Sequence, residues 1–413
     1  MRILILLILL LGIDYYAFQA VRIGALTFPK TGKQTLIGLY LLSSLFCYVY
    51  ILGSYFNLLH KDQGTVFLYL RALVFIVFFS KFFIGLFVAI DDIRRIFLWL
   101  FSQVNPGTAY DSSRSTFISQ MGLIFGALPF ISLTYGMWRN PYRYQLHRHQ
   151  LSIGGLSKNL EGLRIVQISD IHSGTFTNAR PLKKAIKIIN DLKADLVFFT
   201  GDLVNYSADE MQPYLDLFGG IKAEYGVYSV LGNHDYGDYK QWPSIQAKQE
   251  NFQQLIQTHK TLGWDLLRNE HRVVEIKGEK VAVIGVENSS ASPRFHNYGD
   301  LAKATRGLEE GQLKILLSHD PSHWDAEVTK SFRDIHLTLS GHTHGFQFGI
   351  EIPGWLKWSP SKYVYKQWAG LYQQGAQHLY VNRGFGMLGY PGRVGILPEI
   401  TCIDILAKDI KTI

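Results

Sequence analysis

The sequence of residues 335–344 is IHLTLSGHTH, a short run of apolar and β-branched residues that ends in two histidines. A strand of this kind is typically buried, and the residue after it sits at the carboxyl end, where open α/β sheets place their sites. His342 and His344 are two residues apart, so in an extended segment their imidazoles share a face. The stretch therefore predicts a polar site at the end of a buried strand.

Four more apolar runs upstream end in the same way. Together, five such strand ends would bring Asp, His and Asn side chains into one crevice. Oxygen and imidazole ligands without any thiolate suit Mn, Fe, Zn or Mg. Arg164–Ser169 is followed by Asp170 and His172, and Leu196–Thr200 by Asp202. Val227–Leu231 is followed by Asn233, His234 and Asp235, and Lys314–Ser318 by His319.

The carboxylate of Asp202 has two oxygens, so it can bridge two cations. Two divalent ions about 3.5–4 Å apart polarise a phosphoryl oxygen and acidify a bridging water for in-line attack. We therefore expect two metal sites that share Asp202. The expected ligands are Asp170, His172 and His344 for one site, and Asn233, His319 and His342 for the other.

His234 follows an expected ligand directly and is left free for catalysis. We expect it to donate a proton to the leaving oxygen or to steady the phosphoryl charge, with Asp235 orienting its ring. Taken alone, each of these short motifs is more often turn chemistry than a site. Their joint occurrence, in order and each at a strand end, favours the site.

As a set, these residues resemble the five-block signature of the calcineurin-like metallophosphoesterases. The match covers roughly Leu160–Leu406. The resemblance implies a four-layer α/β/β/α sandwich, two divalent metal ions and phosphoester hydrolysis, with His234 as the catalytic histidine. Alternating apolar runs and helical patterns independently favour an α/β fold with helices on both faces of the sheets. The blocks are Asp170-Ile171-His172, Gly201-Asp202, Gly232-Asn233-His234-Asp235, His319 and Gly341-His342-Thr343-His344.

The segments Gly384–Gly386 and Arg393–Glu399 look like the branch of that family that includes membrane-associated bacterial phosphoesterases. Some members of the branch hydrolyse the pyrophosphate of UDP-2,3-diacylglucosamine in lipid A synthesis. The resemblance thus implies a phosphodiester or diphosphate substrate, lipid-linked in this example. Among the metals that the donor set suits, we expect Mn first, with Fe, Zn or Mg as alternatives. Candidate substrate contacts are Arg383, Arg393, Trp355, Trp358, Tyr363 and Tyr365, and plain loop packing is the alternative for each aromatic.

The first third of the chain contains four long apolar runs: Ile3–Val21, Thr35–Leu59, Val66–Ile90 and Thr116–Trp138. Each is near or above the about 20 residues that a helix needs to cross a bilayer. The first run also resembles a signal peptide, but no small-x-small cleavage site follows it, so we expect a retained span. The sequence therefore predicts a four-span, all-α membrane region.

Asp14 and Lys81 lie near the centres of the first and third spans, which run in the same direction. A lone charge at that depth is expensive, and pairing is one remedy. We expect either an intramembrane ion pair or, alternatively, a snorkelling Lys81 beside a protonated Asp14.

These features divide the chain into a membrane region at residues 1–138, a juxtamembrane linker at 139–159 and a catalytic domain at 160–413. Four spans return the chain to its starting side, so the domain shares a compartment with the amino terminus. The basic residues of the loops are nearly balanced between the two sides of the membrane, so their count does not decide the orientation. We slightly favour the cytoplasmic side for the catalytic domain.

The formal net charge is +8, but the basic residues are scattered and no nucleic-acid-binding module is present, so nucleic acid is not expected as a partner. The two cysteines, Cys47 and Cys402, favour neither a disulfide framework nor a thiolate metal site. We therefore expect a membrane-anchored metal-dependent phosphoesterase. The alternative is a membrane sensor or scaffold that uses the same fold only for binding.

Overall fold

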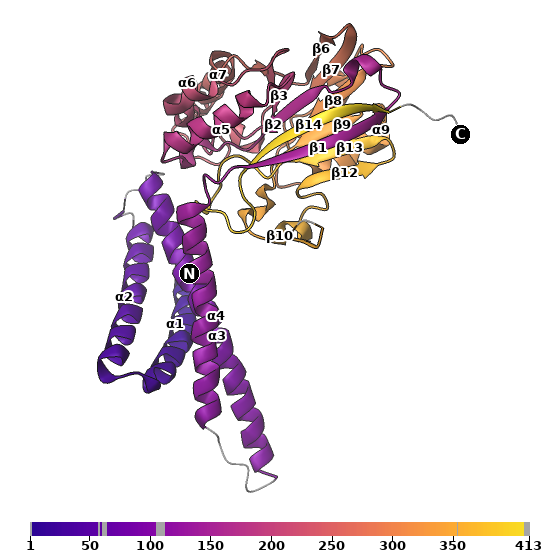
Figure 1. Ribbon diagram of the computed structural model, residues 1–413. Helices are drawn as coiled ribbons and strands as arrows, with labels where there is room; N and C mark the ends of the chain where they lie inside the picture. Colours follow the sequence, from indigo (N-terminus) through magenta and orange to yellow (C-terminus); the bar gives the residue numbers. More distant parts are fainter. Residues whose placement is uncertain (1, 57, 60–63, 105–111, 353, 409–413) are drawn as a thin grey trace. The chain divides into compact units, whose positions relative to one another are not determined.

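The computed structural model describes residues 2–56, 58–59, 64–104, 112–352 and 354–408 (Figure 1). It divides into two compact units, residues 1–138 and residues 139–413.

Four helices make up the first unit, and all four are long and apolar enough to cross a membrane. The four predicted spans fall on them, but the ends differ. The second helix ends at Tyr55, before the predicted Leu59, and the third continues past Ile90. The helices are α1 (Arg2–Gly24), α2 (Lys30–Tyr55), α3 (Thr65–Ser102) and α4 (Ser112–Arg139).

A polar cluster joins α1, α2 and α3 inside this apolar unit. Lys81 Nζ lies 2.7 Å from Asp14 Oδ1, which confirms the predicted ion pair. Ser44 accepts from Lys81 Nζ at 2.6 Å, and the hydroxyls of Ser44 and Tyr40 donate to the same carboxylate oxygen at 3.0 and 2.6 Å. The cost of placing each charge among apolar side chains is thereby offset by a partner.

Two six-stranded sheets form the centre of the second unit. In the first sheet the order is β1 (Gln145–Gly154), β14 (Glu399–Lys408), β2 (Arg164–Ile168), β3 (Leu196–Phe199), β4 (Val227–Ser229) and β5 (Asp265–Leu266). In the second sheet the order is β12 (Gly370–Gln374), β13 (Gln377–Val381), β9 (Leu337–Ser340), β8 (Leu313–Leu317), β7 (Glu279–Gly285) and β6 (Glu270–Ile276).

Helices cover the outer faces of these sheets. Figure 1 shows α5 (Ala179–Asp191), α6 (Leu215–Phe218) and α7 (Ile245–Thr261) on the first sheet. On the second sheet, α8 (Leu301–Ala304) and α9 (Thr329–Ser331) lie in the corresponding layer. A further short hairpin consists of β10 (Ile350–Ile352) and β11 (Leu356–Trp358).

Three buried cores show that the layers are α/β/β/α, as predicted. In β2 and β3, Val166 and Phe199 pack toward α5 and α7, whereas Ile165 and Phe198 pack between the two sheets. This alternation follows from the two-residue period of a strand. A third core joins the second sheet to Leu301 and Ala304 of α8 and to Trp324 and Val328, which precede α9.

The helix α5 illustrates why these segments are helical. Asn178 caps it by accepting a hydrogen bond from the Arg180 backbone N–H. Its buried side chains recur at the spacing of one helix face, which packs onto the sheet. They are Leu182, Ala185, Ile186 and Ile189.

Part of the predicted linker at 139–159 belongs to the first sheet, and to this extent the prediction is wrong. β1 pairs in parallel with β14 over ten positions, from Gln145 with Glu399 to Gly154 with Lys408. Leu151 and Ile153 are buried in the core between the sheets. The polar residues that predict a linker lie mostly in the first half of β1, where no residue is fully buried, and β1 is the edge strand of the sheet.

Candidate metal centre

The carboxyl ends of five strands from both sheets meet at one edge and carry polar side chains. β2 is followed by Asp170 and His172, β3 by Asp202, β4 by Asn233 and His234, β8 by His319, and β9 by His342 and His344. The structure brings six of these residues into two groups, each with donor atoms within 4.8 Å of one another. The groups are Asp170, His172 and His344, and Asp202, His319 and His342.

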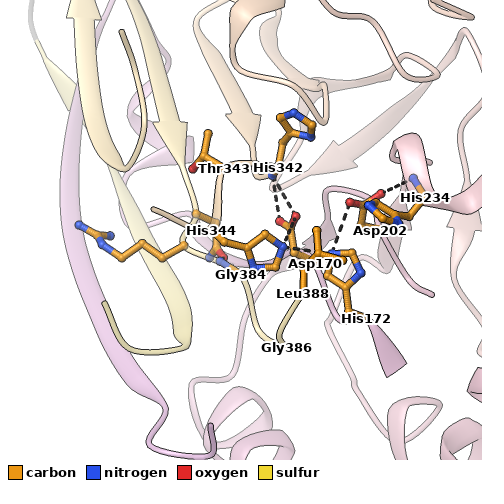
Figure 2. Close-up of polar contacts among 12 residues, drawn as sticks. Asp170, His172, Asp202, His234, His342, Thr343, His344, Gly384, Gly386 and Leu388 are labelled. Atoms are coloured by element: carbon orange, nitrogen blue, oxygen red, sulfur yellow. Dashed lines mark hydrogen bonds and ion pairs between the residues drawn. The ribbon is translucent and has the colours of Figure 1, made fainter. Parts of the chain in front are cut away.

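In the first group, two imidazole nitrogens face each other beside a carboxylate. His172 Nε2 and His344 Nε2 are 3.0 Å apart, and His344 Nε2 is 3.2 Å from Asp170 Oδ1 (Figure 2). All three side chains are buried. A single cation beside these atoms would satisfy all of them at once, so the donor set fits a metal ion.

The carboxylate of Asp202 lies between the two groups. Its Oδ2 is 3.5 Å from His172 Nε2 and 3.2 Å from His319 Nε2. Its Oδ1 accepts a hydrogen bond of 2.8 Å from the backbone N–H of His234. One oxygen therefore faces both groups, while the other fixes the orientation of the carboxylate.

Asn233 and His319 have donor atoms that suit the second group. The Oδ1 atom of Asn233 is buried and has no hydrogen-bond partner, whereas its Nδ2 donates to the Tyr239 hydroxyl at 2.9 Å. His319 Nδ1 donates to the Thr200 carbonyl at 2.7 Å, which leaves Nε2 as its ligand atom. An unpartnered buried oxygen is costly in a protein interior, and a cation would remove that cost.

The protonation states fit a cation as well. Burial lowers the pKa of His172 well below its usual value, so the imidazole is neutral, as a ligand must be. Burial also lowers the pKa of His319, but the Asp202 carboxylate outweighs it and raises that pKa to about 10. The proton on His319 thus balances the charge of Asp202, a role that a metal ion would take over.

The backbone at this edge is strained. Asp170, His172, Asp202, His342 and His344 account for half of the ten non-glycine residues with positive φ in the described part of the chain. Each such residue costs on the order of 1–3 kcal/mol, and strain of this kind gathers at functional sites.

Two glycines of the site leave room for carboxylate groups that lie close to their Cα atoms. A Cβ atom at Gly232 would lie 2.2 Å from Asp202 Oδ1, and one at Gly341 would lie 2.2 Å from Asp170 Oδ2. Any side chain at either position would displace a carboxylate of the site.

His234 stands at the edge of both groups. Its ring lies 4.9 Å from the ring of His172 and 4.3 Å from that of Tyr239. Its Nδ1 donates to the carbonyl of Asn205 at 2.8 Å, so Nε2 is the nitrogen left to meet a substrate.

Asp235 does not orient the His234 ring, so that prediction is corrected. Its carboxylate accepts backbone N–H groups of Gly232, Asp202 and Leu203 at 2.8–2.9 Å. Burial and the nearby Asp202 raise the pKa of Asp235 to about 7. The side chain fixes the loops that hold the ligands and has no contact with the imidazole among the described hydrogen bonds.

The carbonyl that holds His234 is itself held by Glu210, a residue that the motifs did not reveal. Glu210 accepts the backbone N–H groups of Asn205 at 2.6 Å and Tyr206 at 3.0 Å. Burial raises the pKa of Glu210 to about 7. No local pattern separates this glutamate from an ordinary acidic residue in a first helical turn. Asp320, which follows His319 and lies 3.6 Å from His342 Nε2, was likewise missed, although its place at a strand end was a usable signal.

Arg383 and Arg393 do not line the cavity, so their prediction as substrate contacts is corrected. Arg383 is buried between Glu351 and Glu399, with contacts of 2.6 Å to each. Arg393 is fully buried and donates to the carbonyls of Arg383, Gly384 and Gly386. Both guanidinium groups organise loops around the site.

A cavity of about 360 Å³ opens over the two groups, a volume that suits a small ligand. Its polar lining consists of Asp202, Asn233, His234, His342, Thr343, His344 and Gln347. Of the four aromatic residues predicted to meet substrate, only Tyr365 lines it, with its hydroxyl 2.7 Å from His342 Nε2. The other aromatic lining comes from Tyr239, Phe295 and Phe346.

Comparisons with known proteins agree with this geometry. The family model described as calcineurin-like phosphoesterase matches residues 163–346. A second model, described as the transmembrane domain of a probable calcineurin-like phosphoesterase, matches residues 1–141.

Similar proteins are described as metallophosphoesterases or as having a metallophosphoesterase domain. The uncharacterized metallophosphoesterase YkuE of Bacillus subtilis (strain 168) is 30% identical over 307 residues, which cover 71% of this chain and 97% of that protein. A transmembrane protein with metallophosphoesterase domain from Danio rerio is 30% identical over 262 residues, which cover 62% of this chain and 55% of that protein. YkoQ of the same Bacillus strain, also an uncharacterized metallophosphoesterase, is 28% identical over 243 residues, which cover 58% and 82%. With its paired groups of donors and its four apolar helices, this chain belongs to the calcineurin-like metallophosphoesterase family.

Proposed function

We propose that this protein is a membrane-anchored hydrolase that cleaves a phosphodiester or a diphosphate with the help of two divalent metal ions. The observation that carries the proposal is the placement of Asp202 between two groups of buried imidazole and carboxylate donors. Such a pair of ions would polarise a phosphoryl oxygen and lower the pKa of a water for in-line attack.

In this proposal the metal ligands are Asp170, His172, Asp202, Asn233, His319, His342 and His344. The unpartnered Oδ1 of Asn233 and the facing nitrogens of His172 and His344 support the assignment. Oxygen and imidazole donors without thiolate suit Mn, with Fe, Zn and Mg as the alternatives.

His234 is proposed to act on the substrate rather than on the metals. Because the Asn205 carbonyl holds Nδ1–H, a second proton on Nε2 makes the ring cationic. In that form Nε2 donates to the leaving oxygen or stabilises the phosphoryl charge. Asp235 supports the reaction indirectly, through the backbone that carries Asp202 and His234.

The proposed substrate class is a lipid-linked phosphoester, of which UDP-2,3-diacylglucosamine is one example. The four apolar helices support it, because a membrane-anchored enzyme meets lipids directly. The even number of spans supports a catalytic domain on the side of the amino terminus, and we propose the cytoplasmic side.

The test is turnover by the full-length protein in detergent or nanodiscs, stripped with a chelator and reloaded with Mn, Fe, Zn or Mg. Bis-p-nitrophenyl phosphate probes diester cleavage, and UDP-2,3-diacylglucosamine probes the lipid-linked diphosphate. We expect activity to depend on the added metal and to be lost in His234→Ala. Absence of turnover of either substrate with all four metals would instead favour a binding role.

A further inference from the structure

The hairpin β10–β11 directs its polar side chains toward the domain and its apolar side chains toward solvent. Side chains alternate along a strand, and Glu351 pairs with Lys357 while Ile352 pairs with Leu356. Glu351 accepts from Arg383 at 3.0 and 2.6 Å, and the Lys357 ammonium lies 4.9 Å from the Trp368 ring centre and donates to the Ala369 carbonyl. The polar side chains of the hairpin therefore contact the body of the domain, with Glu351 half-buried and Lys357 still partly exposed.

The opposite face carries apolar side chains into solvent. Ile350, Ile352 and Leu356 are exposed, and Trp355 at the turn is 79% exposed. An ordinary surface hairpin buries its apolar face and exposes its polar one. A hairpin held by a partly buried ion pair with its apolar side chains outward indicates that its outer face meets something apolar.

The adjoining segment extends this apolar surface toward the active site. Tyr363 and Val364 are 73% and 60% exposed, and the Tyr363 hydroxyl accepts a hydrogen bond from Trp358. Half-exposed Phe346 also lines the active-site cavity. Beyond residue 138, thirteen large apolar side chains are exposed in the described part of the chain, and seven of them fall in the stretch 346–364. Exposed apolar surface is therefore concentrated in this stretch.

Basic residues flank the same surface. A second cavity of about 760 Å³ is lined by Tyr363, Val364, Arg294, Lys330 and Lys366, and it shares Tyr365 and Phe295 with the active-site cavity. Its one acidic residue, Asp325, is engaged by Lys366 at 3.1 Å. Positive charge beside exposed Trp and Tyr is the composition that prefers the interface between anionic lipid headgroups and acyl chains.

We propose that the hairpin surface, defined as β10, Trp355, β11, Tyr363 and Val364, inserts into the headgroup region of a bilayer that contains anionic phospholipid. The four apolar helices of the same chain are long enough to cross a membrane, so they would tether the domain to a bilayer. The patch is also much smaller than the roughly 20–30 residues per side of a stable protein–protein interface. Insertion needs no hydrolysis, but delivery of a lipid-linked ester to the cavity rests on the proposed function.

The test is a fluorescent probe on the hairpin of the full-length protein in nanodiscs. Trp355→Cys is labelled with bimane, and Ile245→Cys at the start of α7 is the matched control, because both native side chains are 79% exposed. The native Cys47 and Cys402 are buried, so labelling of the unmodified protein gives the background. Phosphatidylcholine carrying a nitroxide on its headgroup or at the fifth acyl carbon serves as the quencher.

We expect the probe at 355 to be quenched more strongly than the probe at 245, and more so when phosphatidylglycerol is added to the nanodisc. A second label at Tyr363→Cys should behave like the one at 355. Equal quenching at 355 and 245 would overturn the proposal. So would a blue-shifted but unquenched probe at 355, which would mean that protein covers the hairpin. Because no substrate is used, the outcome is independent of whether the enzyme hydrolyses a given ester.

Discussion

Two buried polar clusters lie in this chain, one among the apolar helices and one at the strand ends. In the helical cluster, the charged and hydroxyl groups of Asp14, Tyr40, Ser44 and Lys81 all have partners within hydrogen-bonding distance. At the strand ends, by contrast, Asn233 Oδ1 has no partner and two imidazole nitrogens face each other.

The difference separates a structural cluster from a ligand site. Both clusters place charge in apolar surroundings, where unpaired groups are costly. The helical cluster is complete within the chain, so it joins helices and needs nothing more. The strand-end cluster is complete only with added cations, and the strained backbone of its residues is consistent with a site built for them.

The largest effect is expected where one residue serves both metal groups. Asp202→Ala should lose both metals and therefore essentially all turnover, whereas the exposed Asp191→Ala should lose neither. Metal content of the purified protein, measured by mass spectrometry, checks this outcome. Two ions still bound to the Asp202 variant would refute the bridging role.

A smaller but still large effect is expected at His234, which touches substrate rather than metal in the proposed mechanism. His234→Ala should retain both ions while its kcat falls by about 10²–10⁴, the usual contribution of a positioned proton donor. Metal analysis and steady-state kinetics on the same sample test the two halves of the prediction. Loss of metal together with rate would move His234 into the ligand set.

The helical cluster should respond to unbalanced charge and tolerate its complete removal. Asp14→Asn leaves Lys81 without a counter-charge and should destabilise the helical unit by about 3–5 kcal/mol, the usual cost of breaking a buried pair. The double variant Asp14→Leu with Lys81→Met should be much closer to the native protein. Unfolding of the protein in bicelles compares the three. A single variant as stable as the native protein would show that the ion pair is dispensable.

The smallest effect is expected at Glu210, which acts on His234 only through the Asn205 carbonyl. Because burial raises the pKa of Glu210 from 4.5 to about 7, the folded protein retains a proton that the unfolded chain releases. Its contribution to stability is therefore greatest below pH 4.5 and declines as the pH rises to 7. In Glu210→Gln the thermal midpoint should fall less between pH 4.5 and 7 than it does in the native protein. Turnover of the variant should fall by about tenfold or less, as expected for an indirect positioning contact. An unchanged pH profile of stability would contradict this account.

The sequence predicts the spans and the donor residues because each depends on short-range patterns. Length and apolarity are enough for a span, and a polar residue after an apolar strand is enough to suggest a site. For β1 the sequence predicts a linker instead of a strand, because an edge strand with one exposed face is rich in polar residues.

The remaining differences come from contacts between residues far apart in the sequence. The substrate role expected for Arg383 depended on its being free, but Glu351, 32 positions away, already binds it. Likewise the inward face of β10 is set by that arginine, and strands of three residues are too short to reveal a period of their own. The partner of the His234 ring is a backbone carbonyl, which no side-chain motif reports.

The position of β14 has a consequence for biosynthesis. This strand lies between β1 and β2, and it brings together Arg164 and Asp404, which are 240 positions apart. At roughly 5–20 residues per second, a ribosome needs on the order of tens of seconds to make that interval. Throughout that time the position between β2 and the edge strand β1 is vacant, so the first sheet cannot be completed until β14 is made. During translation this open sheet exposes unpaired strand edges to proteases and chaperones.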